Sequence, residues 1–300
     1  MFSLLLTQAI ASGVVTGCVY ALVALSLVII YKSTDVVNFA GGELVMLGAY
    51  VGLLALTYFE VSYAVMFALA VIAVFTTGAI FERVVLGTIV GRRHSAHTEL
   101  VPLVVATVGF GYLLKGLVRA VPYTEEVRRL PPLVSGPPIF IGEAILQRHD
   151  IAIIAVTVVV MAALTVFFNF TLTGKAMRAT SQNGRAAALV GIPVKRMRMA
   201  AWGLASAIAG IAGILLAPKL LMTPDMGVVV MLAFAAAIIG GFTSLPGCVI
   251  GGIALGIVQN FVGILLSPQA IAVTPFFVII VVLMLRPQGL FGEMIATKKV

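Results

Sequence analysis

The chain has 300 residues, of which 61% are hydrophobic and only 10% charged, and its mean hydropathy is +1.17. Because roughly a quarter of the residues in a soluble protein are charged, this composition excludes a water-soluble globular domain. The net charge of +8 is confined to segments between long apolar runs, which indicates loops beside a membrane and not a surface for nucleic acid.

The apolar runs predict an all-α protein, a polytopic bundle of eight or nine transmembrane helices in a single domain over residues 1–300. Each run is much longer than the roughly 9–11 residues of a membrane β-strand. The first run has no basic leader and no cleavage-site pattern, so we expect it to be retained. The predicted spans are Leu4–Ile30, Leu44–Phe59, Val61–Phe81, Leu100–Val121, Ile151–Leu172, Ala200–Ala217, Gly227–Phe242, Cys248–Leu266 and Ala272–Leu285.

A polar break at Tyr31–Glu43 precedes the second span, which is short and is either a full span or a broken helix. Polar residues at membrane depth are costly in lipid, so they are candidates to line a path across the membrane. For Asn38 the alternative is a helix cap, and for the polar pair at 259–260 it is hydrogen bonding between helices. The candidate path residues are Asn38, Gly41, Gly42, Glu43, Thr107, Gln259 and Asn260.

Two polar segments follow in chain order. Glu82–Glu99 is basic and predicts a loop, and Pro122–Asp150, with two Pro-Pro pairs, predicts turns and extended chain with little helix. Between them, Lys115 and Arg119 share one face near the end of their helix, where we expect both side chains to reach the lipid headgroups.

The segment Thr173–Met199 carries six of the nineteen Lys and Arg residues. Ser181 or Asn183 can cap a short helix over the Ala-rich run that follows, and Gly191 with Pro193 can end it. Because apolar runs flank this basic segment on both sides, we expect it to lie along the cytoplasmic face of the membrane.

Leu189 and Val190 form an apolar edge on this short helix and are available to fill the groove of a partner. The alternative is a basic loop that only fixes topology. Placing the segment inside and alternating outward puts thirteen Lys and Arg and five acidic residues inside, against six of each outside. This distribution obeys the positive-inside rule, with the N-terminus outside and the C-terminus in the cytoplasm.

Glycine and proline interrupt several apolar segments, which favours a transporter whose broken helices line the transported molecule's path. A second break, Gly240–Gly247, resembles the Asn38–Gly42 break in having two adjacent glycines. The alternatives are a stand-alone secondary transporter or channel, which needs ion-binding residues in its path, and a membrane-embedded enzyme, which needs clustered acidic or His residues.

Patterns typical of enzymes are missing from the sequence, including nucleotide-binding and hydrolase motifs. His94 and His97 lack further ligands, and Cys18 and Cys248 sit in apolar runs, so we predict no metal site and no disulfide. An ATP-driven role therefore needs a separate nucleotide-binding subunit.

Four segments together resemble the permease subunits of branched-chain amino acid ABC importers, the LivH-type family, and their order covers nearly the whole chain. They are Val37–Glu43 with Leu47–Tyr50, Gly174–Ile192, Gly240–Gly252, and Arg286–Gly292. The resemblance implies transport of branched-chain amino acids or related small carboxylates and amides across the inner membrane of a prokaryote.

The resemblance also implies partners: a second permease subunit, identical or homologous, two cytoplasmic ATPases and an external solute-binding protein. It implies no cofactor in this chain, because the partner subunits bind ATP. The short cytoplasmic helix would be the coupling helix, seated on the ATPase. Its expected coupling residues are Arg185, Ala186, Ala187, Leu189, Val190 and Gly191.

Overall fold

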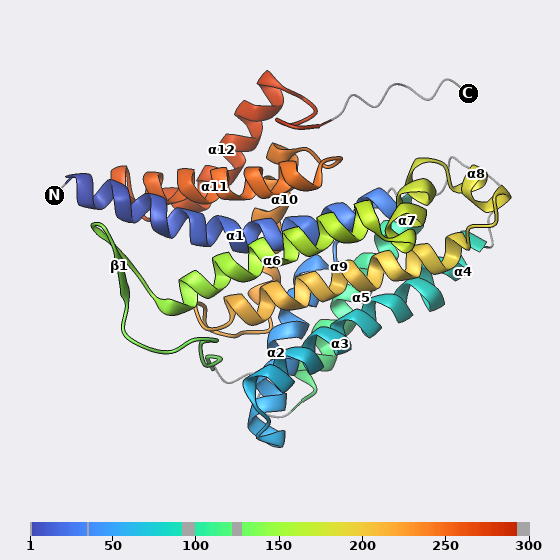
Figure 1. Cartoon of the computed structure of the whole chain (residues 1–300), viewed down its shortest axis with the longest axis horizontal. Coiled ribbons are helices and arrows are strands. Elements are labelled where there is room, and N and C mark those ends of the chain that lie inside the picture. The colour runs from blue at the N-terminus through green and yellow to red at the C-terminus, as the bar shows by residue number, and fades with distance from the viewer. Residues whose placement is uncertain (1, 35, 92–99, 122–127, 293–300) are drawn as a thin grey trace. The chain divides into compact units, whose positions relative to one another are not determined.

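The structure, a computed structural model, describes residues 2–34, 36–91, 100–121 and 128–292 and is predominantly helical (Figure 1). Seven described helices are long and apolar enough to cross a membrane. They are α1 (Phe2–Thr34), α2 (Gly41–Phe59), α3 (Tyr63–Phe81), α5 (Leu100–Arg119), α6 (Arg148–Phe170), α9 (Val194–Leu216) and α11 (Leu245–Leu265).

Two shorter apolar helices complete the set of predicted spans. These are α10 (Val229–Gly240), which follows the 3-10 turn η3 (Met226–Val228), and α12 (Ala270–Leu285). The all-α class is therefore confirmed, and each predicted span overlaps one of these helices. In the polar segment Pro122–Asp150, the described residues form a small hairpin of β1 (Ile139–Ile141) and β2 (Ala144–Leu146).

Among the boundaries that differ from the sequence prediction, two differ most. The α3 helix does not end in a loop at Glu82 but continues through a π-helical turn, η1 (Glu82–Leu86), and α4 (Gly87–Gly91). At the other place, α9 begins at Val194 and not at Ala200. In both places the prediction ended the helix where charged residues begin. Glu, Lys and Arg are good helix formers, so the helix continues through them.

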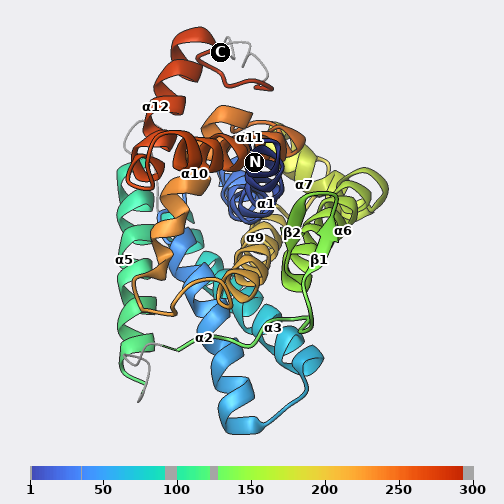
Figure 2. The ribbon, with the colours of Figure 1, turned by 90° about the vertical axis from the view of Figure 1, so that its left-hand side faces the viewer.

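The contacts divide the chain into two compact units, and two of the boundaries between them fall inside α1 and α6. In the unit that contains residues 29–133 and 158–228, α9 packs against both α2 and α3 (Figure 2). The helices meet at glycines: Gly48 lies against Gly210, and Gly213 lies against the Val45 carbonyl. Small residues let the two backbones approach closely, and the resulting van der Waals contact helps helices to associate in lipid.

In the other unit, the first part of α1 lies against α11. Gly13 and Gly17 of α1 face Gly256 and Gly252 of α11, so this contact too is made through backbone. The β-hairpin is attached to α1 by a side-chain amide, because Gln8 accepts a hydrogen bond from the Ile145 N–H at 2.8 Å and donates one to its carbonyl at 3.1 Å.

The predicted break near Gly240 is a tight turn between α10 and α11 that also holds the segment after α12. Gly241, at φ +98°, and Gly289, at φ +80°, adopt backbone conformations that favour glycine. The Leu290 N–H donates to the Ile239 carbonyl at 2.8 Å, and the Phe291 N–H to the Gly240 carbonyl at 3.2 Å. The glycines of two separate sequence motifs therefore form one backbone-paired turn.

We expect Gly213→Ala to lower the stability of the detergent-solubilised protein by about 1–3 kcal/mol, because the added methyl group would overpack against Val45. Gly109→Ala is the matched control, since a Cβ at Gly109 would meet nothing within 4 Å. Thermal unfolding of the two variants beside the wild type makes the comparison. Equal melting temperatures would show that the contact between α9 and α2 can relax freely.

Candidate functional site

The start of α2 is a break in the helical chain and carries a buried amide. The side chain of Asn38 is 1% exposed, and its Oδ1 accepts a hydrogen bond from the Ala40 N–H at 3.0 Å. Asn38 therefore closes a turn just before α2 and is not its helix cap, because the cap position is held by Ala40 without a side-chain hydrogen bond. The Asn38 amide nitrogen is also buried and is left without a hydrogen bond to the described residues.

Helix α5 brings further polar groups to this point. The buried hydroxyl of Thr107 donates to the Val104 carbonyl at 2.8 Å and lies 3.5 Å from the Phe39 N–H. One turn along α5, a Cβ on Gly111 would lie 3.2 Å from Oε2 of Glu43. The structure thus brings together Asn38, Glu43 and Thr107, which sequence analysis selected separately.

Gly41 and Gly42 are buried at the start of α2, and Gly42 packs backbone to backbone against Gly227 of η3. The residue that leads into η3, Asp225, forms ion pairs with Lys115 and, at 3.5 Å, with Arg119. Lys115, through its hydrogen bond and its charge, holds the pKa of the Asp225 carboxyl below its usual range. The pair therefore persists at neutral pH and is lost only when acid protonates the carboxylate.

Lys115 and Arg119 therefore pair with a carboxylate of the chain, an interaction that the expected contact with headgroups did not include. Sequence analysis missed their partner because Asp225 lies in a distant part of the chain, and spacing gives no signal for such a pair.

Gln259 and Asn260 belong to the other unit, and the structure does not place them with Asn38. The Gln259 amide donates to the Ile271 carbonyl at 3.1 Å, a hydrogen bond from α11 to α12. The Asn260 amide donates to the Gly256 carbonyl at 2.9 Å within α11. The predicted alternative, hydrogen bonding between helices, is thus confirmed for Gln259.

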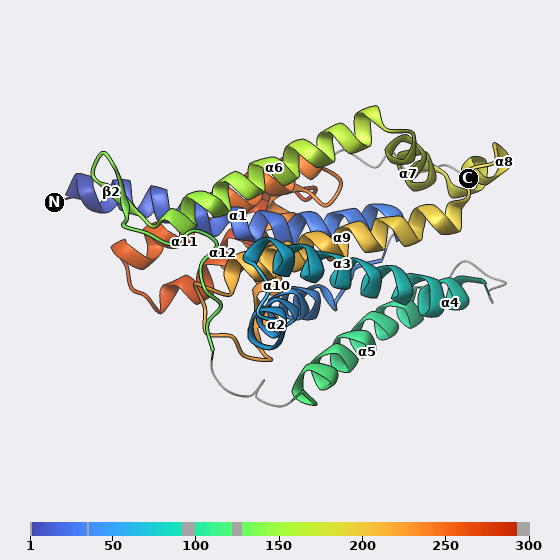
Figure 3. The ribbon, with the colours of Figure 1, turned by 60° about the horizontal axis from the view of Figure 1, so that its bottom comes forward.

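The basic segment 173–199 forms α7 (Leu172–Gln182), α8 (Gly184–Leu189) and the first turns of α9. Asn183 caps α8, its Oδ1 accepting from the Ala186 N–H at 3.0 Å. The predicted stop is also confirmed, because Gly191 adopts φ +84° directly after the helix. In Figures 1 and 3, α8 lies at the same end of its unit as α4.

The residues of α8 divide into those that hold it and those that project from it. Ala187 is 4% exposed, so it packs inside the unit and is not available to a partner. Arg185 and Ala186 are exposed, and Leu189 and Val190 are 89% and 77% exposed. Two adjacent apolar side chains so fully exposed among basic residues are the features of a docking edge.

A buried ion pair, which sequence analysis did not find, lies near this end of the unit. Nε of Arg198 on α9 lies 3.2 Å from Oε1 of Glu82, whose side chain is 3% exposed. Neither of these two atoms makes a hydrogen bond to the described residues, so the ion pair leaves both without one. The available signal was the apolar run Val84–Leu86 after Glu82, which predicts a continuing helix.

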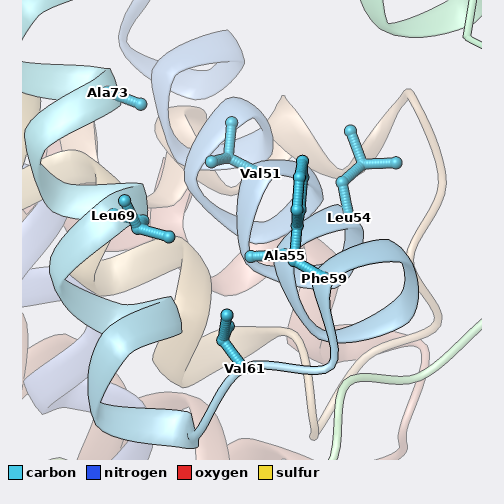
Figure 4. A pocket seen from close by; sticks show the side chains of 7 residues that line it. All are labelled: Val51, Leu54, Ala55, Phe59, Val61, Leu69 and Ala73. Carbon is cyan, nitrogen blue, oxygen red and sulfur yellow. The ribbon is translucent and has the colours of Figure 1, made fainter.

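One pocket lies between α2 and α3 and has a volume of about 500 Å³ (Figure 4). Its lining is entirely apolar: Val51, Leu54, Ala55, Phe59, Val61, Leu69 and Ala73. A pocket without polar groups cannot orient a charged or zwitterionic molecule. The polar cluster at the start of α2 and the exposed edge of α8 are therefore the two candidate sites.

Residues 9–285 match the family described as branched-chain amino acid transport system, permease component. The chain belongs to this permease family. It is 30% identical to the high-affinity branched-chain amino acid transport system permease proteins BraD of Pseudomonas aeruginosa and LivH of Escherichia coli, with 95% of each chain covered. It is 27% identical to a probable LivH of Methanocaldococcus jannaschii, with 90% of this chain and 88% of that protein covered.

The permease shares its fold with a solved structure, PsaBC from Streptococcus pneumoniae in complex with Fab. The TM-score is 0.51 at 13% sequence identity, with 95% of the permease and 92% of that chain covered. The family and the fold thus agree with the resemblance carried by the four sequence motifs. His94 and His97, considered and set aside as metal ligands, lie outside the described residues.

We expect Asn38→Leu to reduce uptake by about tenfold, because the Asn38 Nδ2 is a candidate donor to a charged group of the transported molecule. A hydrogen bond to a charged group contributes about 1.5–3 kcal/mol. Asn38→Ser separates the two roles of Asn38, since a hydroxyl can still accept from the Ala40 N–H but the amide donor is lost. Uptake of the radiolabelled transported molecule is measured in cells with matched permease levels. Normal uptake by the Ser variant would show that Asn38 acts only by closing the turn before α2.

Proposed function

We propose that this permease moves branched-chain amino acids, or related small carboxylates and amides, as the transmembrane subunit of an ATP-driven importer. The observation that carries the proposal is the family match over residues 9–285. The names of BraD and LivH, each 30% identical over 95% of the chain, support the substrate class.

The polar cluster at the start of α2 suits such a substrate. An amino acid carries a carboxylate and an ammonium group. The Asn38 amide and the first N–H groups of a helix favour an anion, and the Glu43 carboxylate favours a cation. Glu43 is only partly buried, so part of its side chain remains exposed.

We propose that α8 is the coupling helix. Burial of apolar area is favourable by about 25 cal/mol per Å², so the exposed Leu189 and Val190 side chains favour a protein partner. In the proposed assembly the partners are two cytoplasmic ATPases, which bind the ATP, a second permease subunit and an external solute-binding protein. Closure of the ATPases moves α8 and reorients the spans, and the permease itself does no covalent chemistry.

The proposed orientation places α7 and α8 in the cytoplasm, the N-terminus outside and the C-terminus inside. The distribution of Lys and Arg supports it, with thirteen on the α8 side and six on the other. The inner membrane of a prokaryote is the proposed location.

Single-cysteine labelling tests this orientation. Cys18 and Cys248 are both buried and are first replaced by Ala. Ser135→Cys, an exposed position near the hairpin, should react with an impermeant thiol reagent in intact cells. Ser181→Cys should react only after the membrane is permeabilised, and labelling of Ser181→Cys from outside would reject the orientation.

Replacing Leu189 by Asp tests the coupling role. The charge would enter a dry contact at a cost of several kcal/mol if it stays unpaired. We therefore expect the variant to reach the membrane but to lose the ATPase in a pull-down, or to keep it without substrate-stimulated ATP hydrolysis in vesicles. Gln182→Asp, an exposed position at the end of α7, is the matched control. Survival of binding, stimulated hydrolysis and transport in Leu189→Asp would make α8 a topological anchor only.

A further inference from the structure

The interface of α3 and α9 contains a line of polar atoms that the family match does not explain. Arg198, Trp202 and Ser206 succeed one another at intervals of four residues, so they lie on one face of α9. The Arg198 Nε, the Trp202 Nε1 and the Ser206 Oγ are all buried, and none makes a hydrogen bond to the described part of the chain.

On the other side of the interface, α3 and its continuation η1 place one residue against each of these three side chains. Glu82 lies opposite Arg198 at 3.2 Å, and Phe81 lies edge-on to Trp202 with ring centroids 5.4 Å apart. One turn earlier in α3, Gly78 leaves room for Ser206. Nearly all buried polar groups in native proteins are hydrogen-bonded, so three such atoms without a bond are unusual. A second arrangement of α3 and α9 could give these atoms hydrogen-bond partners.

The interface connects the two candidate sites through direct contacts. At one end, the turn at residues 190–193 joins α8 to α9, and Arg198 lies in the second turn of α9. At the other end, the Phe81 ring stacks on Phe110 of α5, with centroids 3.9 Å apart. Phe110 lies between Thr107 and Gly111, the α5 residues that face the start of α2.

Packing alone does not require charges at this position. A buried ion pair is costly to desolvate, and apolar residues of similar volume often replace one without loss of stability. Glu82 also begins the π-helical turn η1, and such turns occur frequently at functional sites.

We propose that Glu82 and Arg198 are positioning residues of the transport cycle. Their ion pair holds the first turns of α9 against η1, so that a movement of α8 is passed to α3 and, through Phe81 and Phe110, to α5. This inference rests on the proposed coupling role of α8, and it assigns the route by which coupling reaches the start of α2.

The test replaces the pair by apolar residues of similar size, Glu82→Leu with Arg198→Met, and includes Glu82→Gln as a near-isosteric single change. The permease is assembled with its ATPase and binding protein in vesicles, and leucine uptake and ATP hydrolysis are measured together. Arg196→Gln is the matched control, because Arg196 lies on the same turn of α9 but is exposed.

We expect the double variant and Glu82→Gln to bind the ATPase as the wild type does. Leucine moved per ATP hydrolysed should fall about fivefold or more, the size of a typical coupling between sites. Arg196→Gln should keep the wild-type ratio. A structural role alone predicts the opposite for the double variant, because restored packing would restore transport.

Wild-type leucine transport per ATP in the double variant would overturn the proposal. If the double variant fails to assemble, Glu82→Gln decides alone, and a wild-type ratio there has the same meaning. Failure of the α8 proposal is distinguishable, since Leu189→Asp would then remain coupled. If Leu189→Asp is uncoupled while both pair variants are coupled, only the route through Glu82 and Arg198 is rejected.

Discussion

Close backbone contact between α9 and α2 determines where both candidate sites lie. In lipid, helices gain nothing by hiding apolar side chains from one another, so their association depends on van der Waals contact and hydrogen bonds. Gly210 and Gly213 on α9 permit that contact with Gly48 and Val45 on α2. Because the turn after α8 leads directly into α9, one helix both packs against α2 and is joined to α8, the proposed coupling helix.

Among the described residues, most of the buried side-chain polar atoms that make no hydrogen bond belong to the unit of residues 29–133 and 158–228. They include Nδ2 of Asn38 and the line of atoms along α9 that faces α3. Each such group costs about 1–3 kcal/mol by protein mutational data, so a bundle selected for stability alone would not keep them together. Unsatisfied groups at the proposed path and along the proposed route of coupling are consistent with a permease that must exchange one set of contacts for another.

The sequence predicts local features of this permease better than its long-range contacts. The spans follow from hydrophobic length, and the Asn183 cap and the Gly191 stop follow from residues close to α8. The pairing of Glu82 with Arg198 and of Asp225 with Lys115 depends on which helices become neighbours, which no spacing in the sequence specifies. For the same reason Asn38 and Thr107 were chosen for their polarity, while their proximity comes only from the packing of α5 beside α2.

The contact between Gly42 and Gly227 has a thermodynamic consequence. Neither residue has a side chain, so separating α2 from η3 there would expose peptide groups and almost no apolar surface. Hydration of peptide groups lowers the heat capacity, whereas hydration of apolar groups raises it. Separating Gly42 from Gly227 would therefore have only a small heat-capacity change. This heat-capacity change would shift the equilibrium between the closed and open contact very little as the temperature of the cell changes.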